Sequence, residues 1–170
     1  MRIISGAIFL FLGLFFITGC SQNRPNKLYI NEFMASNSSF STDEFNENDD
    51  WIEIYNPNSH PVDIGGMYIS DSKNNLTKQQ IPTTASELTT IEPNNFLVLW
   101  ADGQTEQGAL HLGIKLSNLG EDLILTAPNG FIVDSYNYNS QKANVSMGRK
   151  PDGSNNWVTF ETPTPSASNN

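Results

Sequence analysis

Polar and apolar side chains alternate most regularly in residues 49–57, DDWIEIYNP. Because successive side chains of a strand point to opposite faces of a sheet, this alternation predicts a half-buried β-strand that stops at the Asn-Pro pair. Ile52 and Ile54 share one face, and Trp51 and Glu53 share the other. The charge of Glu53 makes the isoleucine face the predicted core face.

Short apolar runs separated by Gly, Pro, Asn and Ser recur along the rest of the chain. They predict further strands at residues 28–34, 62–64, 67–71, 77–81, 88–91, 96–101, 111–117, 122–127, 131–136, 145–149 and 157–160. The continuous apolar run 96–101 predicts a strand covered on both faces, and the Asn129-Gly130 pair predicts a hairpin turn. No window has a helical period of useful length. Many short strands at this spacing favour an antiparallel sandwich or barrel.

The first twenty residues have the pattern of a secretion signal. Arg2 is followed by the apolar run 7–17 and then by Thr18-Gly19-Cys20. The run is too short for a comfortable membrane span. The end of the run resembles the bacterial lipoprotein signal, in which the cysteine receives a lipid and becomes the mature first residue. The alternative is an ordinary signal peptide that ends near a cysteine.

Cys20 is the predicted lipid attachment residue, and it is also the only cysteine of the chain. An internal disulfide is therefore excluded, and lipidation would account for the odd thiol of a secreted protein. Each buried methylene of an acyl chain stabilises membrane attachment by about 0.8 kcal/mol, so several chains would anchor the protein durably. The expected location is the cell envelope, on the outer face of a membrane, which would be the outer membrane in a Gram-negative organism.

The predicted organisation is a signal peptide at 1–19, a tether at 20–27, one domain at 28–162 and a tail at 163–170. The tail is rich in Pro, Ser and Asn, and we expect it to run over the surface or to fray. The formal net charge is −9, and removing residues 1–19 takes away one basic side chain and no acid. A chain this acidic does not suit nucleic acid as a partner, because nucleic acid requires clustered Lys and Arg.

Several of the predicted segments together resemble the lamin tail domain family. They are Ile30-Asn31-Glu32, residues 50–56, Asp63-Ile64-Gly65-Gly66, residues 97–101 and residues 116–125. Residues 148–169, with Pro151-Asp152-Gly153 and Trp157, are similar to the bacterial branch in particular. The resemblance implies an all-β fold, an immunoglobulin-like antiparallel β-sandwich, and a non-catalytic module. Two positions depart from the pattern, since Met67 stands in place of a tryptophan and Ser166 in place of a glycine.

Only two histidines could take part in acid-base chemistry, His60 in a Pro-flanked turn and His111 beside a loop. Neither lies near a nucleophile motif, so both are predicted to be surface residues without catalytic duty, and the chain is predicted not to be an enzyme. A zinc site is not expected either, because the histidines are far apart in sequence and the one cysteine is committed to lipid.

The acidic loop 43–50 is the best metal candidate, because calcium prefers several oxygen ligands. Its calcium candidates are Asp43, Glu47, Asp49 and Asp50. The loop departs from the EF-hand pattern, which requires a ligand where Phe45 stands and also a glycine, so a solvated acidic loop is the favoured interpretation.

Three aromatic residues on or next to predicted strands, Tyr136, Tyr138 and Trp157, are expected to fill the core. The alternative is a surface platform for glycan or peptide stacking.

These observations predict a membrane-anchored, non-catalytic lipoprotein whose lamin-tail-like domain binds a protein or an envelope polysaccharide. The alternatives are a calcium-dependent glycan-binding module and an accessory of a secreted hydrolase. The expected partners are the membrane, through the lipid on Cys20, and an unidentified protein or polysaccharide. No cofactor is expected apart from the calcium candidate.

Overall fold

The computed structural model describes residues 26–170, so the predicted signal peptide and Cys20 lie outside the described residues. The strands are β1 (Tyr29–Met34), β2 (Trp51–Asn56), β3 (Val62–Asp63), β4 (Tyr68–Ser70), β5 (Gln79–Gln80), β6 (Thr90–Ile91), β7 (Asn95–Trp100), β8 (Asp122–Thr126), β9 (Ile132–Asn137), β10 (Ser146–Arg149) and β11 (Trp157–Phe160). The helical elements are short, α1 (Ser86–Thr89) and the 3-10 turn η1 (Thr105–Gln107). Within the described part, no helix reaches the length and hydrophobicity that crossing a membrane requires.

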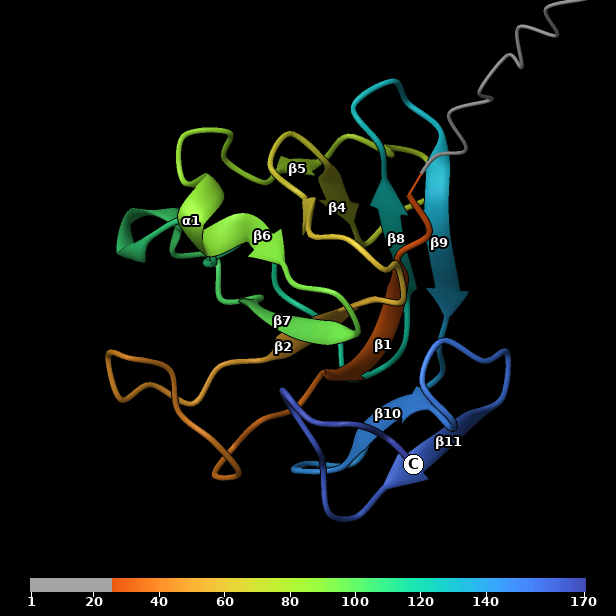
Figure 1. Ribbon diagram of the computed structural model, residues 1–170. Coiled ribbons are helices and arrows are strands. Elements are labelled where there is room, and N and C mark those ends of the chain that lie inside the picture. Colours follow the sequence, from red (N-terminus) through yellow and green to blue (C-terminus); the bar gives the residue numbers. More distant parts are fainter. Residues whose placement is uncertain (1–25) are drawn as a thin grey trace, which may run out of the picture.

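The strands form two main antiparallel sheets that pack together, as the sequence predicted. One sheet has the order β11-β10-β1-β2-β7 and the other has the order β5-β4-β8-β9, while β3 and β6 form a small third pair (Figure 1). The shared core takes Phe33, Ile52 and Ile54 from the first sheet and Ile69 and Leu125 from the second. The hydrophobic contact between these two inner faces holds the sandwich together.

The predicted hairpin is present, with β8 and β9 paired across the Asn129-Gly130 turn. Gly130 has a φ of 87°, in the left-handed region where glycine is favoured. The Ala127 amide donates to the Phe131 carbonyl and closes the loop at 2.8 Å. Local turn chemistry was therefore sufficient to place this pair of strands.

The strand β2 is buried on both faces, whereas the alternation in sequence indicated one core face. Ile52 and Ile54 face the core as expected, but Trp51 and Glu53 are also 0% exposed. The cover over Glu53 comes from the end of the chain, where the Ser166 amide donates to Oε2 of Glu53 at 2.6 Å. The strand is thus buried on both faces at Glu53, because a distant segment lies across it there, while Tyr55 stays half-buried.

The tail crosses the outer face of the five-stranded sheet and does not fray. Pro163 and Asn169 are both buried. The Thr164 amide donates to Oε1 of Glu32 at 3.0 Å, and the Thr164 hydroxyl donates to Oε2 at 2.7 Å. Buried carboxylates require such donors, so the tail is a structural part of the sheet.

The strand β7 is an edge strand, which corrects the prediction that residues 96–101 are covered on both faces. Leu99 is fully buried, but Phe96, Leu97 and Val98 are only half-buried. Likewise, residues 111–117 do not form the predicted strand and make only isolated bridges, Trp100 with His111 and Asp102 with Lys115. An apolar run alone does not determine where a strand lies in its sheet.

A buried ion pair links the two sheets. Arg149 on β10 donates from Nη2 to both carboxylate oxygens of Asp134 on β9, at 3.0 and 2.9 Å, and from Nε to the Ile30 carbonyl at 2.8 Å. Its guanidinium also lies over the Trp157 ring, 4.5 Å from the ring centroid. Burial raises the pKa of Asp134 despite the opposing charge of Arg149, which indicates a strongly desolvated pair.

Candidate functional site

The loop between β1 and β2 is folded tightly by the side chain of Asn37. Its Nδ2 donates to the carbonyls of Ser41 and Asp49, both at 2.8 Å, and its Oδ1 accepts from the Phe40 amide at 3.0 Å. The Asn37 amide in turn donates to Oδ1 of Asp50 at 2.9 Å. These bonds draw the two ends of the loop together and give its acidic residues defined positions.

Asp43 occupies the centre of this loop and is only 7% exposed. Its Oδ1 accepts hydrogen bonds from the amides of Phe45 and Glu47, at 2.9 and 2.8 Å. Its Oδ2 is buried and has no hydrogen-bond partner among the described residues. An Asp side chain that organises a turn with one oxygen therefore leaves the second oxygen unsatisfied.

Three of the four calcium candidates lie together. One carboxylate oxygen each from Asp43, Glu47 and Asp49 lies within 4.8 Å of the others, and Asp50 is not in this group. Burial and the neighbouring charges of Asp102, Asp43 and Glu47 raise the pKa of Asp49 above its usual range. The cluster is thus a compact region of negative charge.

Two further residues, Asp102 and His111, adjoin the same cluster from the segment that follows β7. The Asp43, Asp102 and His111 ligand atoms also lie within 4.8 Å of one another. The segment between Trp100 and His111 folds back on itself, because the Trp100 amide donates to the Leu110 carbonyl at 2.8 Å. No signal in the sequence around residue 102 indicated this meeting, which depends on how the loops fold onto each other.

The prediction that His111 is a surface residue is wrong, because it is 1% exposed. Its Nδ1 pairs with Oδ2 of Asp102, and its Nε2 lies 3.2 Å from Oε1 of Glu44. Burial disfavours the charged imidazole, but these two carboxylates outweigh burial and raise the pKa of His111. The edge of the Phe45 ring completes the enclosure, at 5.7 Å between ring centroids.

His60 is exposed as predicted, and its Nε2 lies 3.0 Å from the side-chain oxygen of Asn26. Both nitrogens of the buried His111 are occupied by carboxylates. Neither histidine is therefore bonded to a serine or threonine nucleophile in the described part of the chain, where a hydrolytic triad would require such a contact.

The three predicted core aromatics pack together with Phe33. Tyr138 is buried and lies 4.6 Å from Phe33 between ring centroids. Tyr136 and Trp157 stack at 3.8 Å and pack against the same cluster. The core interpretation is confirmed for Tyr138, whereas Tyr136 and Trp157 are half-buried and pack against the margin of the core.

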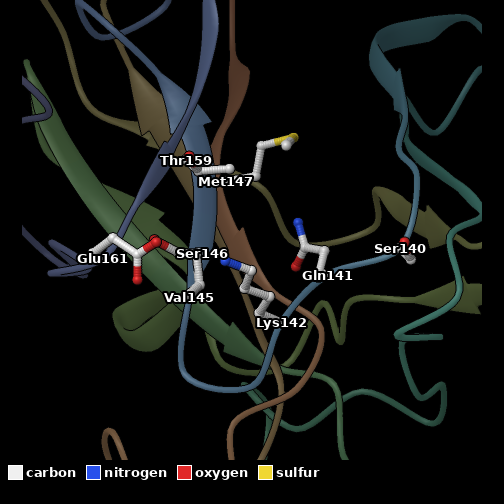
Figure 2. A pocket seen from close by; sticks show the side chains of 8 residues that line it. All are labelled: Ser140, Gln141, Lys142, Val145, Ser146, Met147, Thr159 and Glu161. Carbon is white, nitrogen blue, oxygen red and sulfur yellow. The ribbon is translucent and has the colours of Figure 1, made fainter.

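A hollow of about 160 Å³ lies beside β10 and β11. Figure 2 shows the side chains that line it, which come from the two strands, the loop before β10 and the residue after β11: Ser140, Gln141, Lys142, Val145, Ser146, Met147, Thr159 and Glu161. Gln141 also supports the backbone, since its Oε1 accepts from the Ala35 amide at 3.1 Å. The lining contains one basic and one acidic side chain, Lys142 and Glu161, among polar and apolar ones. It does not bring together a group of potential metal ligands.

The fold and the site together define an immunoglobulin-like, all-β module, with one family match and no catalytic family. The chain belongs to the lamin tail domain family, whose model matches residues 21–140. The match ends before β10, so the last two strands of the five-stranded sheet lie beyond it. A comparison with curated proteins finds no match.

Proposed function

We propose that this chain is a membrane-anchored, non-catalytic lipoprotein of the bacterial branch of the family, whose domain binds a protein or polysaccharide of the cell envelope. The observation that carries the proposal is the lamin tail fold itself, in which neither histidine contacts a serine or threonine nucleophile among the described residues. His111 is enclosed by Asp102 and Glu44, and His60 lies exposed beside Asn26. A purified protein that turned over a hydrolase substrate, with the activity abolished by a single substitution, would contradict the proposal.

The anchor in this proposal is a lipid on Cys20, supported by the signal pattern of residues 1–19. The test is membrane fractionation of the Cys20→Ser variant expressed in its own host. The variant is expected to leave the membrane fraction, because Cys20 carries the only thiol available for lipid attachment. Gln22→Ala changes a neighbouring residue but keeps the thiol, so it serves as the matched control and should stay in the membrane fraction. A Cys20→Ser variant that remained there would refute lipid anchoring.

The binding surface in this proposal is formed by loops. Large apolar side chains are exposed at turns, including Leu119 at 80% and Phe131 at 73%. Exposed apolar side chains on loops offer apolar area that a partner can cover, and contiguous apolar surface is what marks an interaction site. Both residues lie on connections adjoining β8, which anchors them to the sandwich.

The test of this surface is site-specific photo-cross-linking in intact envelope. A photoreactive residue placed at Leu119 or Phe131 is expected to give discrete cross-linked species, and one placed at Glu87 on α1 serves as the control. The same products from all three positions would show nonspecific proximity and would refute this surface. Mass spectrometry of the discrete species would identify the partner.

A second candidate function, calcium-dependent glycan binding, is favoured by the position of Phe45. Its ring is 48% exposed, and its amide bonds to Asp43 at the carboxylate cluster. An exposed aromatic ring supplies a large apolar face that a ligand such as a sugar ring can cover. Glycan binding that required calcium and was lost in the Phe45→Ala variant would support this function. Glycan binding that persisted in the presence of a calcium chelator would refute it.

A further inference from the structure

The carboxylate cluster of Asp43, Glu47 and Asp49 contains buried oxygens that accept no hydrogen bond, which is unusual for a solvated acidic loop. Oδ2 of Asp43 and Oδ2 of Asp49 are both buried, and neither has a hydrogen-bond partner among residues 26–170. Asp43 itself is more than nine-tenths buried. A buried anionic oxygen without a donor is costly, so a cation, a proton or a bound water has to compensate it.

No side chain of the described part is ion-paired with Asp43, Glu47 or Asp49, although the charge of Lys115 lowers the pKa of Asp49 against the larger effect of burial. The ion pairs there are Lys78 with Asp71, Arg149 with Asp134, and His111 with its two carboxylates. His111 is turned to Asp102 and Glu44. Within residues 26–170, no lysine or arginine is ion-paired with the cluster of Asp43, Glu47 and Asp49.

The spacing of the cluster is short enough for one calcium ion to contact all three carboxylates. Calcium binds oxygen ligands at about 2.4 Å, so two oxygens on opposite sides of one ion lie about 4.8 Å apart. The oxygens of Asp43, Glu47 and Asp49 lie within 4.8 Å of one another. Their chemistry is also suitable, because carboxylate ligands favour calcium, whereas soft transition metals favour sulfur ligands.

The positions of the ligands are held by neighbouring bonds. Asp43 is fixed through its Oδ1, which accepts the amides of Phe45 and Glu47. Glu47 is fixed through its Oε2, which accepts from Nε2 of Gln104 at 3.0 Å and from Nε2 of Gln107 at 2.8 Å. Since both glutamines belong to the segment after β7, the cluster already bridges two loops.

We propose that Asp43, Glu47 and Asp49 bind a calcium ion that ties the loop between β1 and β2 to the segment 102–107. Asp102 adjoins Asp43 and adds negative charge next to this site while it is paired with His111. The bound ion compensates the unpartnered oxygens and stabilises both loops. This site goes beyond the proposed binding role, and its failure would remove only the calcium-dependent alternative.

The experiment is calorimetric titration of the purified full chain with calcium chloride after treatment with a chelator, together with thermal unfolding. Binding of one ion per chain and a rise of the melting temperature in millimolar calcium are expected, because a ligand that binds only the folded state stabilises it. Magnesium should bind more weakly, since it demands a closer octahedral set of ligands. No heat and no thermal shift would overturn the proposal, and so would equal binding of magnesium.

The variants Asp43→Asn and Asp49→Asn test the assignment of the ligands. Each is expected to weaken calcium binding at least on the order of tenfold, because ligand charge determines affinity. Glu92→Gln, an exposed acid outside the cluster, is the matched control and should bind as the wild type does. Asp49→Asn keeps the test decisive if Asp43→Asn fails to fold. Unchanged calcium binding in Asp49→Asn would refute this site.

Discussion

Replacing Glu53 by glutamine should remove a large part of the pH dependence of stability. Glu53 is fully buried on β2 and accepts hydrogen bonds from Nδ2 of Asn31 at 3.1 Å and from the Ser166 amide at 2.6 Å. Burial, opposed by these two donors and reinforced by the charge of Glu32, raises the pKa of Glu53 to about 8. The folded protein therefore holds a proton on this carboxyl at neutral pH.

The sign of the effect follows from the direction of this shift. The pKa of Glu53 in the folded state exceeds the ordinary value of 4.5 that it has in the unfolded chain. The folded state binds the proton more tightly, so stability is fullest below pH 4.5 and falls as the pH rises towards 8. At about 1.4 kcal/mol per pKa unit, the loss between pH 5 and pH 8 is on the order of 4 kcal/mol.

The assay is urea unfolding of the wild type and of Glu53→Gln at pH 5, 6.5 and 8. The variant should be less stable than the wild type at pH 5 by about 1 to 2 kcal/mol, because an amide cannot accept both donors. The free energy of unfolding of the variant should also fall much less than that of the wild type between pH 5 and pH 8. His111 contributes to the wild-type decline in the same direction, since its pKa is also raised, so the difference between the two proteins isolates Glu53.

A control and a refuting result complete this test. Glu92→Gln removes an exposed carboxyl and should keep the wild-type dependence on pH. If Glu53→Gln declined as steeply as the wild type, then Glu53 would not be the buried, protonated group that its surroundings indicate.

Three further perturbations test the sandwich by thermal or urea unfolding. Arg149→Lys should cost about 3 kcal/mol, because a lysine cannot span Asp134 and the carbonyls that the guanidinium reaches; a neutral effect would contradict the buried pair. Deleting residues 163–170 should destabilise by several kcal/mol, because two buried glutamates lose donors; unchanged stability would mean that the tail is dispensable. Gly120→Ala should lower stability more than Gly130→Ala. The methyl group added at Gly120 would lie 2.5 Å from a backbone oxygen, whereas the methyl group added at Gly130 would meet nothing within 4 Å. Equal losses of stability in the two variants would mean that only the positive φ shared by both glycines matters.

The strands that sequence reasoning placed well are those whose signal is local. The alternation in residues 49–57 predicted β2, and the Asn129-Gly130 pair predicted the β8–β9 turn. The family resemblance drew on the same segments, and the family match confirms it over residues 21–140. Periodicity and turn chemistry depend on neighbours in the chain, so they can be read without knowing the fold.

The candidate site was only partly predictable. The acidic loop was recognised from its composition, and Asp43, Glu47 and Asp49 do lie together. Asp102 was missed because it enters the cluster from a loop that is distant along the chain. Asp50 was included because it is adjacent in sequence, whereas its carboxylate accepts the Asn37 amide and holds the loop closed.

The sequence by itself determined most of the strands and the family of this protein, because hydrophobic period and turn residues act over short distances along the chain. Only the tertiary structure decided that Glu53 and His111 are buried and that Asp102 adjoins Asp43. Burial depends on which distant segment covers a side chain. For Glu53 that segment is the tail, which lies at the opposite end of the described chain.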